Sequence, residues 1–372
     1  MITRPLRAEI DLAAIKHNFR EAKKAVGEKV HVMAVVKANA YGHGLVRVAQ
    51  AASQAGAASF GVAIPEEGAI LRDAGLVEQI HVLTEAASEA IPLVLDHDLT
   101  ATVFSRGSAL ALSDAAIRRG RVVRVHVKVD TGMNRVGLTP ERVPELIREI
   151  RSMPGLDLEG IFTHFSEADN PVSDYTAYQI SRFKGLIQEL EAEGICPRIK
   201  HAANSAGLYL YPDSHFDMVR VGISLYGLHP SKATRAVADL RPALSLKAWL
   251  SYTKKLAQGE GVSYGRTYKA SRDTVIATVP AGYGDGYSRL LSNKAEVLIG
   301  GLRYPAVGNI CMDQFMVDVG PDSAIEADDE VVLIGRQGGE EISADEMASL
   351  LGTINYEVVC MINGRVPRVY KE

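Results

Sequence analysis

The chain has 372 residues, of which 47% are hydrophobic and 23% are charged. These proportions are typical of ordinary folded proteins, and they exclude a disordered chain, a fibrous repeat and a disulfide-rich miniprotein. The formal net charge of −4 gives no global attraction for nucleic acid or an anionic membrane, so we expect small molecules or protein surfaces as partners. A single core rarely grows beyond roughly 250–300 residues, so the length predicts two domains.

The cysteines and the apolar segments indicate the cellular setting. Cys196, Cys311 and Cys360 form no CxxC pair, so the sequence predicts neither a disulfide framework nor a zinc ribbon, and no metal site. The first residues reach charged side chains at once and lack the apolar core of a signal peptide. No apolar run approaches the roughly 18–20 residues that span a bilayer. We therefore expect a cytoplasmic, reduced protein that binds neither membranes nor nucleic acid.

From about residue 28, short β-branched segments alternate with longer segments of helical periodicity. The expected strands are residues 30–36, 59–64, 79–83, 99–104, 122–129, 156–165, 197–202 and 216–222. Expected helices begin at Pro65 and near Ser105, end at Gly75 and Gly120, and include the long amphipathic segment 174–194. Such alternation predicts parallel strands joined by right-handed crossovers. Eight units in about 200 residues predict an α/β fold with a (β/α)8 barrel of the TIM type, and an open doubly wound sheet is the alternative.

The alternation stops near residue 230. The rest of the chain consists of short β segments separated by Gly, Asn and Asp turns, with one helix expected near 343–351. Residues 7–12 form a further expected strand that joins this second domain. We therefore predict a barrel over residues 12–234 and a mostly β C-terminal domain over residues 235–372, which also includes the N-terminal strand 1–11.

In such barrels, reactive groups stand at the carboxyl ends of the strands. Lys37 directly follows the first expected strand, where partial desolvation would lower its pKa and expose an amine able to form a Schiff base. A lysine that merely reaches solvent is the alternative, although small residues and the anion-binding hydroxyl of Tyr41 follow it. Lys128 either faces solvent or, facing the barrel, needs a neutralising partner or a modification. Arg135 lies in a Gly-flanked loop suited to a phenolate or carboxylate, and His164 stands at the end of the sixth strand.

The last two strands of the barrel predict an anion site. Asn204 and Ser205 are suited to begin a helix, where free N–H groups favour a phosphate. Arg220 lies in the eighth strand, and the backbone amides of Gly222 and Ile223 follow it as further donors. Phosphate sites after strands seven and eight are common in TIM-type barrels.

Eight motifs and a C-terminal segment carry a resemblance to a known family. The motifs are AVVKANAYGHG, VDTGMNRVG, THF, HAANSAG, RVGISLYG, VSYGRTY, GYGDGY and GNICMDQFMVDVG, within residues 34–320, and the segment is NYEVVCMINGRVPRVY. Together they resemble the alanine racemases, two-domain enzymes that use pyridoxal 5′-phosphate (PLP). The resemblance implies an isomerase that interconverts L-alanine and D-alanine, supplies D-alanine for cell-wall peptidoglycan, and works as a homodimer with shared active sites.

By this resemblance, Lys37 would hold PLP as a Schiff base and act as one of two catalytic bases. Arg220 would face the pyridine nitrogen of PLP with His164 behind it, which would leave that nitrogen largely unprotonated. Arg135 would hydrogen-bond the ring phenolate and contact the substrate, and Lys128 matches a position that is carbamylated in many relatives. The remaining cofactor contacts would be Tyr41, Asn204, Ser205, Gly222, Ile223 and Tyr356.

Racemisation needs a second acid–base group on the opposite face of the substrate Cα. The resemblance assigns this role to Tyr264 from the β domain of the neighbouring subunit. An ordinary tyrosine has a pKa near 10, so a nearby positive charge would have to lower it, and His201 matches the family's partner for that tyrosine. By the same resemblance, Tyr283, Met312 and Asp313 would line the substrate entrance and pocket of the partner's site, with Met312 in contact with the substrate.

Three other functions compete with alanine racemisation. A PLP-binding module without racemase activity would lack the β domain that residues 235–372 supply. An amino-acid decarboxylase of the same fold type would need an acidic partner at the ring nitrogen, where this chain has Arg220. A racemase of broader specificity is the nearest rival, because the size of the substrate pocket cannot be read from the sequence.

Overall fold

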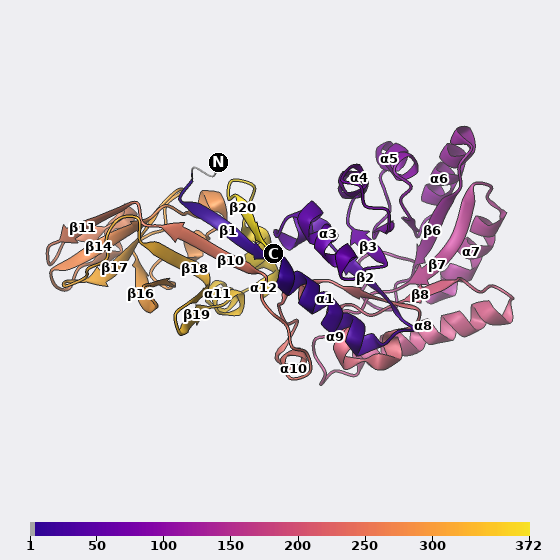
Figure 1. The fold of residues 1–372 in the computed structure, drawn as a ribbon. Helices are drawn as coiled ribbons and strands as arrows, with labels where there is room; N and C mark the ends of the chain where they lie inside the picture. Colours follow the sequence, from indigo (N-terminus) through magenta and orange to yellow (C-terminus); the bar gives the residue numbers. More distant parts are fainter. Residues whose placement is uncertain (1–3) are drawn as a thin grey trace. The chain divides into compact units, whose positions relative to one another are not determined.

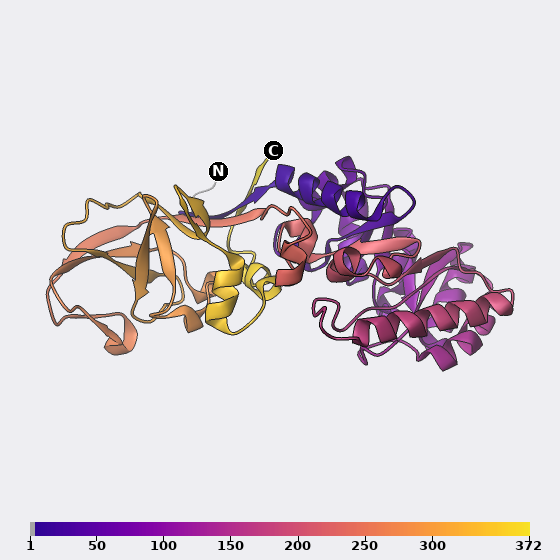
Figure 2. The same ribbon diagram turned by 90° about the horizontal axis from the view of Figure 1, so that it is seen from below.

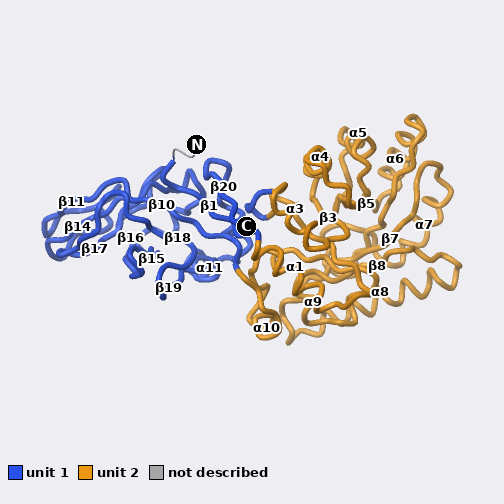
Figure 3. The backbone as a smooth tube through the Cα atoms, viewed as in Figure 1, with its two compact units in different colours: residues 1–12, 41–44, 242–372 blue, residues 13–40, 45–241 orange. Residues whose placement is uncertain are grey.

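The computed structural model describes residues 4–372, which divide into two compact units (Figure 3). The barrel unit comprises residues 13–40 and 45–241, and the β unit comprises the N-terminal residues through Leu12 together with residues 41–44 and 242–372. The division after Arg241 lies beyond the predicted boundary at 234/235. Asn18 explains the difference, because its side chain donates to the Arg241 carbonyl (2.9 Å) and accepts from the Arg241 amide (2.8 Å), which fixes this segment to the barrel unit.

Eight parallel strands form the barrel sheet, in the order β4-β3-β2-β9-β8-β7-β6-β5. The strands are β2 (His31–Val35), β3 (Ser59–Val62), β4 (Gln79–Val82), β5 (Ala101–Val103), β6 (Val123–Lys128), β7 (Leu156–Phe162), β8 (Ile199–His201) and β9 (Met218–Val221). A parallel bridge between His81 and Thr100 joins the two outer members of this order. Thr100 donates to Ile80 (2.8 Å) and accepts from Val82 (2.9 Å) across the same gap. The sheet therefore forms a nearly closed barrel, which confirms the predicted fold class and excludes the open sheet.

The helices of this unit lie outside the barrel strands (Figures 1 and 2). They are α1 (Leu12–Val26), α3 (Leu45–Gln54), α4 (Pro65–Asp73), α5 (Ile91–Asp96), α6 (Arg106–Arg119), α7 (Val143–Ser152), α8 (Tyr175–Ala192), α9 (Ser205–Leu210) and α10 (Lys232–Arg235). The ends of α6 follow the expected capping chemistry: the Ser105 hydroxyl accepts from the Ser108 amide, and Gly120 has a left-handed φ of 60°. The long amphipathic segment forms α8, whose buried face includes Phe183, Leu186 and Leu190.

The β unit is built on a ten-stranded, mostly antiparallel sheet with the main order β11-β14-β17-β16-β15-β18-β10-β1-β20, and β19 pairs with β18. Its strands are β1 (Leu6–Asp11), β10 (Leu244–Trp249), β11 (Tyr252–Leu256), β14 (Thr274–Val279), β15 (Glu296–Ile299), β16 (Leu302–Val307), β17 (Phe315–Gly320), β18 (Glu330–Gln337), β19 (Glu340–Ile342) and β20 (Arg368–Lys371). A separate hairpin pairs β12 (Gly261–Val262) with β13 (Tyr268–Lys269). Two helices, α11 (Ala344–Leu351) and α12 (Asn355–Met361), lie between β19 and β20 in the sequence. β1 pairs with β10 and β20, so the N-terminal strand belongs to this unit. Within residues 4–372, no helix combines the length and apolar character that a membrane span requires.

Candidate active site

Lys37 begins a left-handed turn, α2 (Lys37–Tyr41), just after β2 ends. Ala38, Asn39 and Ala40 have φ values of 51°, 53° and 54°, and Tyr41 has a φ of 50°. A left-handed conformation costs a residue with a Cβ roughly 1–2 kcal/mol, so the surroundings must hold this turn in place. Strain of this kind is retained mainly at functional sites, which singles out the lysine turn.

Side chains of the barrel unit provide that support. The Asn39 side-chain oxygen accepts from the Leu45 amide at 2.9 Å. The Glu67 carboxylate accepts from the Asn39 amide at 3.3 Å and from the Ala63 amide at 2.9 Å, so it joins the ends of β2 and β3. Glu67 was not predicted from the sequence. Its signal was an acidic side chain in the first turn of a helix that begins with proline, a position from which a carboxylate reaches back to preceding amides.

Replacing Glu67 with glutamine is expected to lower the free energy of unfolding by about 1–2 kcal/mol, because an amide NH2 would face one of the two N–H donors. Urea denaturation of the full-length protein measures the change. Glu66→Gln is the matched control: Glu66 is an exposed neighbour on the same helix turn. Equal stabilities of the two variants would contradict the supporting role of Glu67.

Arg220 is fixed inside the barrel by four contacts. It is only 4% exposed. Its Nη1 lies 2.8 Å from Nδ1 of His201, and its Nη2 lies 3.1 Å from Nδ1 of His164. Nη2 also donates to the carbonyls of Thr163 and Ala202, both at 2.8 Å. Burial lowers the pKa of Arg220 to about 9, so the guanidinium stays charged at neutral pH.

Lys128 faces the inside of the barrel, which excludes the solvent-facing alternative. It is 5% exposed, and its Nζ lies 4.3 Å from the centre of the Phe162 ring. Burial, reinforced by the positive charges of Arg220 and Arg135, holds the pKa of Lys128 well below its usual value. The structure therefore places a buried amine with a lowered pKa beside the positively charged Arg220 and Arg135.

The Arg135 loop is organised by one carboxylate. The Asp130 carboxylate accepts from the amides of Gly132 (2.9 Å) and Asn134 (3.0 Å). The Leu138 carbonyl in turn accepts from the Asp130 amide at 2.7 Å, which closes the loop at its base. Arg135 stands exposed in this loop, so its guanidinium is available to a ligand.

Ser205 and the segment after β9 form a cluster of hydrogen-bonding groups. The Ser205 hydroxyl accepts from the Gly222 amide at 2.8 Å and lies 3.4 Å from the Ser224 amide. Ile223 begins the short 3-10 segment η4 (Ile223–Tyr226). The Asn204 side chain accepts from the Gly207 amide at 2.9 Å. Asn204 thus caps the N-terminus of α9, while the Ser205 hydroxyl and the Gly222 amide lie within hydrogen-bond distance of each other.

The other predicted site residues belong to the β unit. The rings of Tyr41 and Tyr356 lie 6.3 Å apart and are tilted. Tyr264 begins η5 (Tyr264–Arg266) and is 71% exposed. Its carbonyl accepts from the Asn309 side chain at 2.6 Å, and its neighbour Ser263 has a left-handed φ of 62°. The fold therefore presents the Tyr264 side chain on the surface of this chain.

Tyr283, Met312 and Asp313 lie near one another in the β unit. The Tyr283 amide donates to the Cys311 carbonyl at 3.1 Å, which joins η6 (Tyr283–Asp285) to the segment that carries Met312. Met312 is 53% exposed, and Asp313 accepts from Arg365 at 2.6 Å. A surface with exposed aromatic and thioether side chains is typical of a binding site.

One predicted role disagrees with the structure. His201 is completely buried, and its two ring nitrogens are occupied by Arg220 at 2.8 Å and by His126 at 2.9 Å. Burial and the neighbouring Arg220 charge also hold the pKa of His201 well below its usual value. A neutral imidazole with both nitrogens engaged supplies no positive charge to a tyrosine, so His201 supports Arg220 instead. His126 was also missed, although strand alternation places it on the same face as Lys128.

Comparison with known proteins identifies the family. The model of the alanine racemase N-terminal domain matches residues 10–230, and that of the C-terminal domain matches residues 243–370. The chain belongs to the alanine racemase family. The alanine racemase of Symbiobacterium thermophilum is 49% identical over 99% of this chain and 97% of its own length, and that of Desulfovibrio desulfuricans is 47% identical over 99% of both.

Solved structures extend the same comparison. An alanine racemase of Clostridium difficile 630 is 40% identical, covers 100% of this chain and 97% of its own, and superposes with a TM-score of 0.94. A histidine racemase of Leuconostoc mesenteroides is 32% identical over 100% of this chain and 99% of its own, with a TM-score of 0.92. The fold is thus shared by racemases that are named for different amino acids.

Proposed function

We propose that this protein interconverts L-alanine and D-alanine with PLP bound at the mouth of the barrel. The observation that carries the proposal is the strained turn that begins with Lys37, in a chain whose whole length matches alanine racemases. A lysine amine at the end of a buried strand is suited both to bind an aldehyde and to move a proton.

The groups of the barrel unit fit this cofactor. The Ser205 hydroxyl and the Gly222 amide suit a phosphate, together with the Ile223 amide. Arg220 is suited to contact the ring nitrogen of PLP, and Arg135 is suited to hydrogen-bond its phenolate oxygen. When bound, PLP would withdraw electrons from the Cα–H bond of the substrate. Because the Arg220 guanidinium donates a hydrogen bond but has no acidic proton to transfer, it would leave the ring nitrogen of PLP largely unprotonated.

Two residues of this protein would move the proton. Lys37 would take it from, or return it to, one face of the substrate Cα, and Tyr264 would serve the opposite face. The 71% exposure of Tyr264 supports its use by a second copy of the chain. We therefore propose a homodimer in which the Tyr264, Tyr283, Met312 and Asp313 side chains of each β unit serve the partner's barrel.

Lys128 is proposed to carry a carbamate, formed when its neutral amine attacks CO2 and releases a proton. The product would place an anion beside Arg135 and Arg220, whose charges now depress the pKa of the amine. We expect a carbamate carbon signal in NMR spectra of protein equilibrated with 13C-bicarbonate, and its loss in Lys128→Ala. An unchanged spectrum after the substitution would assign the signal to another amine.

The decisive test of the proposed function is racemisation by the purified protein supplied with PLP. L-Alanine, L-serine and L-histidine are each incubated with the enzyme, and both enantiomers are measured by chiral chromatography. We expect alanine to be turned over far faster than the bulkier substrates. Faster turnover of histidine would indicate the specificity of the histidine racemase with the same fold, and a decarboxylated product would contradict racemisation altogether.

The biological role follows from this activity and from the family. We propose that the protein works in the cytoplasm and supplies D-alanine for peptidoglycan. Expression in a bacterium that cannot grow without added D-alanine is expected to restore growth. Failure of an expressed, active protein to do so would argue against this role.

A further inference from the structure

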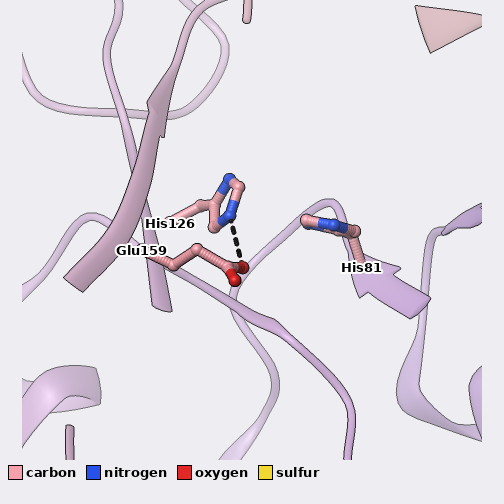
Figure 4. Close-up of side chains that lie close together, drawn as sticks. All are labelled: His81, His126 and Glu159. Atoms are coloured by element: carbon pink, nitrogen blue, oxygen red, sulfur yellow. Dashed lines mark hydrogen bonds and ion pairs between the residues drawn. The ribbon is translucent and has the colours of Figure 1, made fainter. Parts of the chain in front are cut away.

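A line of buried hydrogen bonds runs through the barrel from Arg220 to Glu159. Arg220 Nη1 contacts Nδ1 of His201 at 2.8 Å, and Nε2 of His201 contacts Nδ1 of His126 at 2.9 Å. Nε2 of His126 then contacts the Glu159 carboxylate at 3.0 Å (Figure 4). All four residues are buried. They come from four neighbouring strands, β9, β8, β6 and β7.

The direction of every proton in this line follows from its two ends. Arginine only donates hydrogen bonds, so Nδ1 of His201 must accept, and the proton of His201 must lie on Nε2. That proton is donated to Nδ1 of His126, which leaves the His126 proton on Nε2, directed at the carboxylate. We propose that His201, His126 and Glu159 form a one-way relay of hydrogen bonds that holds Arg220 as a charged donor. In this relay, His126 and Glu159 are positioning residues.

The charges at the two ends agree with this direction. Burial holds the pKa of both His201 and His126 below the usual value, so each ring is neutral and carries a single proton. Burial alone would raise the pKa of Glu159, but the bond from His126 holds it below its usual value, so the carboxylate is charged. The relay thus places an anion at one end and the Arg220 cation at the other.

The backbone is shaped to bring Glu159 into the relay. The register of β6 against β7 pairs Val125 with Leu158 and then His126 with Gly160, so Glu159 is an additional, unpaired residue. A bulge of this kind redirects a side chain. A Cβ on Gly160 would lie 2.5 Å from the His126 ring, so glycine is required there to admit the ring. The Gln79 side chain also donates to the Glu159 carboxylate.

A metal ion is the competing use of this cluster. His81, His126 and Glu159 are buried, and their ligand atoms lie within 4.8 Å of one another (Figure 4). Nε2 of His81 is buried without a hydrogen-bond partner in the described part of the chain. A metal ion would have to bind the lone pair of His126 Nε2, but in the relay this nitrogen carries a proton. To free that lone pair, both histidines would have to carry their protons on Nδ1 instead of Nε2. The Nδ1 proton of His201 would then point at an N–H proton of Arg220, so the charged arginine disfavours metal binding.

The first experiment reads the protons directly and does not depend on activity. The full-length protein is labelled with 15N-histidine, and its ring nitrogens are assigned with His126→Gln and His201→Gln. We expect both histidines to be protonated on Nε2, with and without PLP. A proton on Nδ1 of either ring, or a stoichiometric metal ion that is lost in His81→Ala, would overturn the relay.

The second experiment tests what the relay does, and this part rests on the proposed function. Glu159→Gln removes the charge but keeps an oxygen that accepts from His126, and we expect kcat to fall about 10-fold with little change in KM, together with a shifted absorbance of bound PLP. Asp157→Asn is the control, because Asp157 lies on the same strand and shares Arg198 with Glu159. The control is expected to stay within about twofold of wild type.

The outcomes of the two experiments are distinct. Equal kcat values and spectra for Glu159→Gln and Asp157→Asn would overturn the functional role of the relay. Absence of racemisation in the wild-type protein would contradict the proposed function, while the 15N spectrum would still decide how the protons are arranged.

Discussion

Replacing Lys37 with alanine is expected to reduce alanine racemisation by roughly 10,000-fold or more. The substitution removes the amine that would bind PLP and the base that would serve one face of the substrate. Initial rates with each enantiomer, measured by chiral chromatography, give the loss. The visible absorbance of the protein supplied with PLP gives a second readout, because the band of the Schiff base should disappear.

Two controls separate lost chemistry from lost structure in Lys37→Ala. Lys29→Ala removes an exposed lysine just before the opposite end of β2, and it should retain wild-type activity. Added methylamine should restore part of the activity of Lys37→Ala, since a free amine can occupy the space left by the side chain. Full turnover by Lys37→Ala without added amine would show that another residue moves the proton.

Tyr264→Phe is expected to lower racemisation by about 1,000-fold, because it removes one hydroxyl that would serve as the second acid–base group. The ring is 71% exposed, so stability should change by less than about 0.5 kcal/mol. Tyr252→Phe removes the hydroxyl of another exposed tyrosine of the β unit and should have no effect. Full activity of Tyr264→Phe would show that a different residue is the second acid–base group.

Mixing these two inactive variants tests whether the sites are shared. A heterodimer of Lys37→Ala and Tyr264→Phe chains would contain one site with both substitutions and one site with neither. Random pairing would therefore restore about one quarter of wild-type activity, since half of the dimers are mixed and half of their sites are intact. Complete inactivity of exchanged mixtures would indicate that each chain supplies both residues to its own site.

The sequence predicted the barrel well because parallel strands leave a strong local signal. A strand buried on both faces is a continuous β-branched run, and all eight expected runs contain an observed strand. The ends of the helix before Gly120 were also predictable, since serine and glycine act there through their own backbone chemistry. Lys37, Arg135 and Arg220 were found because strand ends and loops collect ligand-binding groups.

The features that were missed depend on contacts between distant segments. The left-handed residues after Lys37 are Ala38, Asn39 and Ala40. None of them is a glycine, so residue preferences gave no sign of this turn. The His201–His126 contact links two strands separated by 75 positions in sequence, and the bulge at Glu159 exists only in the register against β6. His201 was given the wrong partner because its type and position did not reveal that Arg220 already occupies one of its nitrogens.

The assignment of residues 41–44 to the β unit limits how this protein can be divided. The chain passes between the two units after residues 12, 40, 44 and 241, so a cut at any single position leaves the units joined. Within the β unit, a Cβ on Gly42 would lie 2.3 Å from the Val359 carbonyl, and Arg368 donates to the Gly42 carbonyl at 3.0 Å. A barrel expressed alone would deprive the residues next to the Lys37 turn of these partners. The two units are therefore not exchangeable modules, and a chimera must take residues 41–44 from the same parent as its β unit.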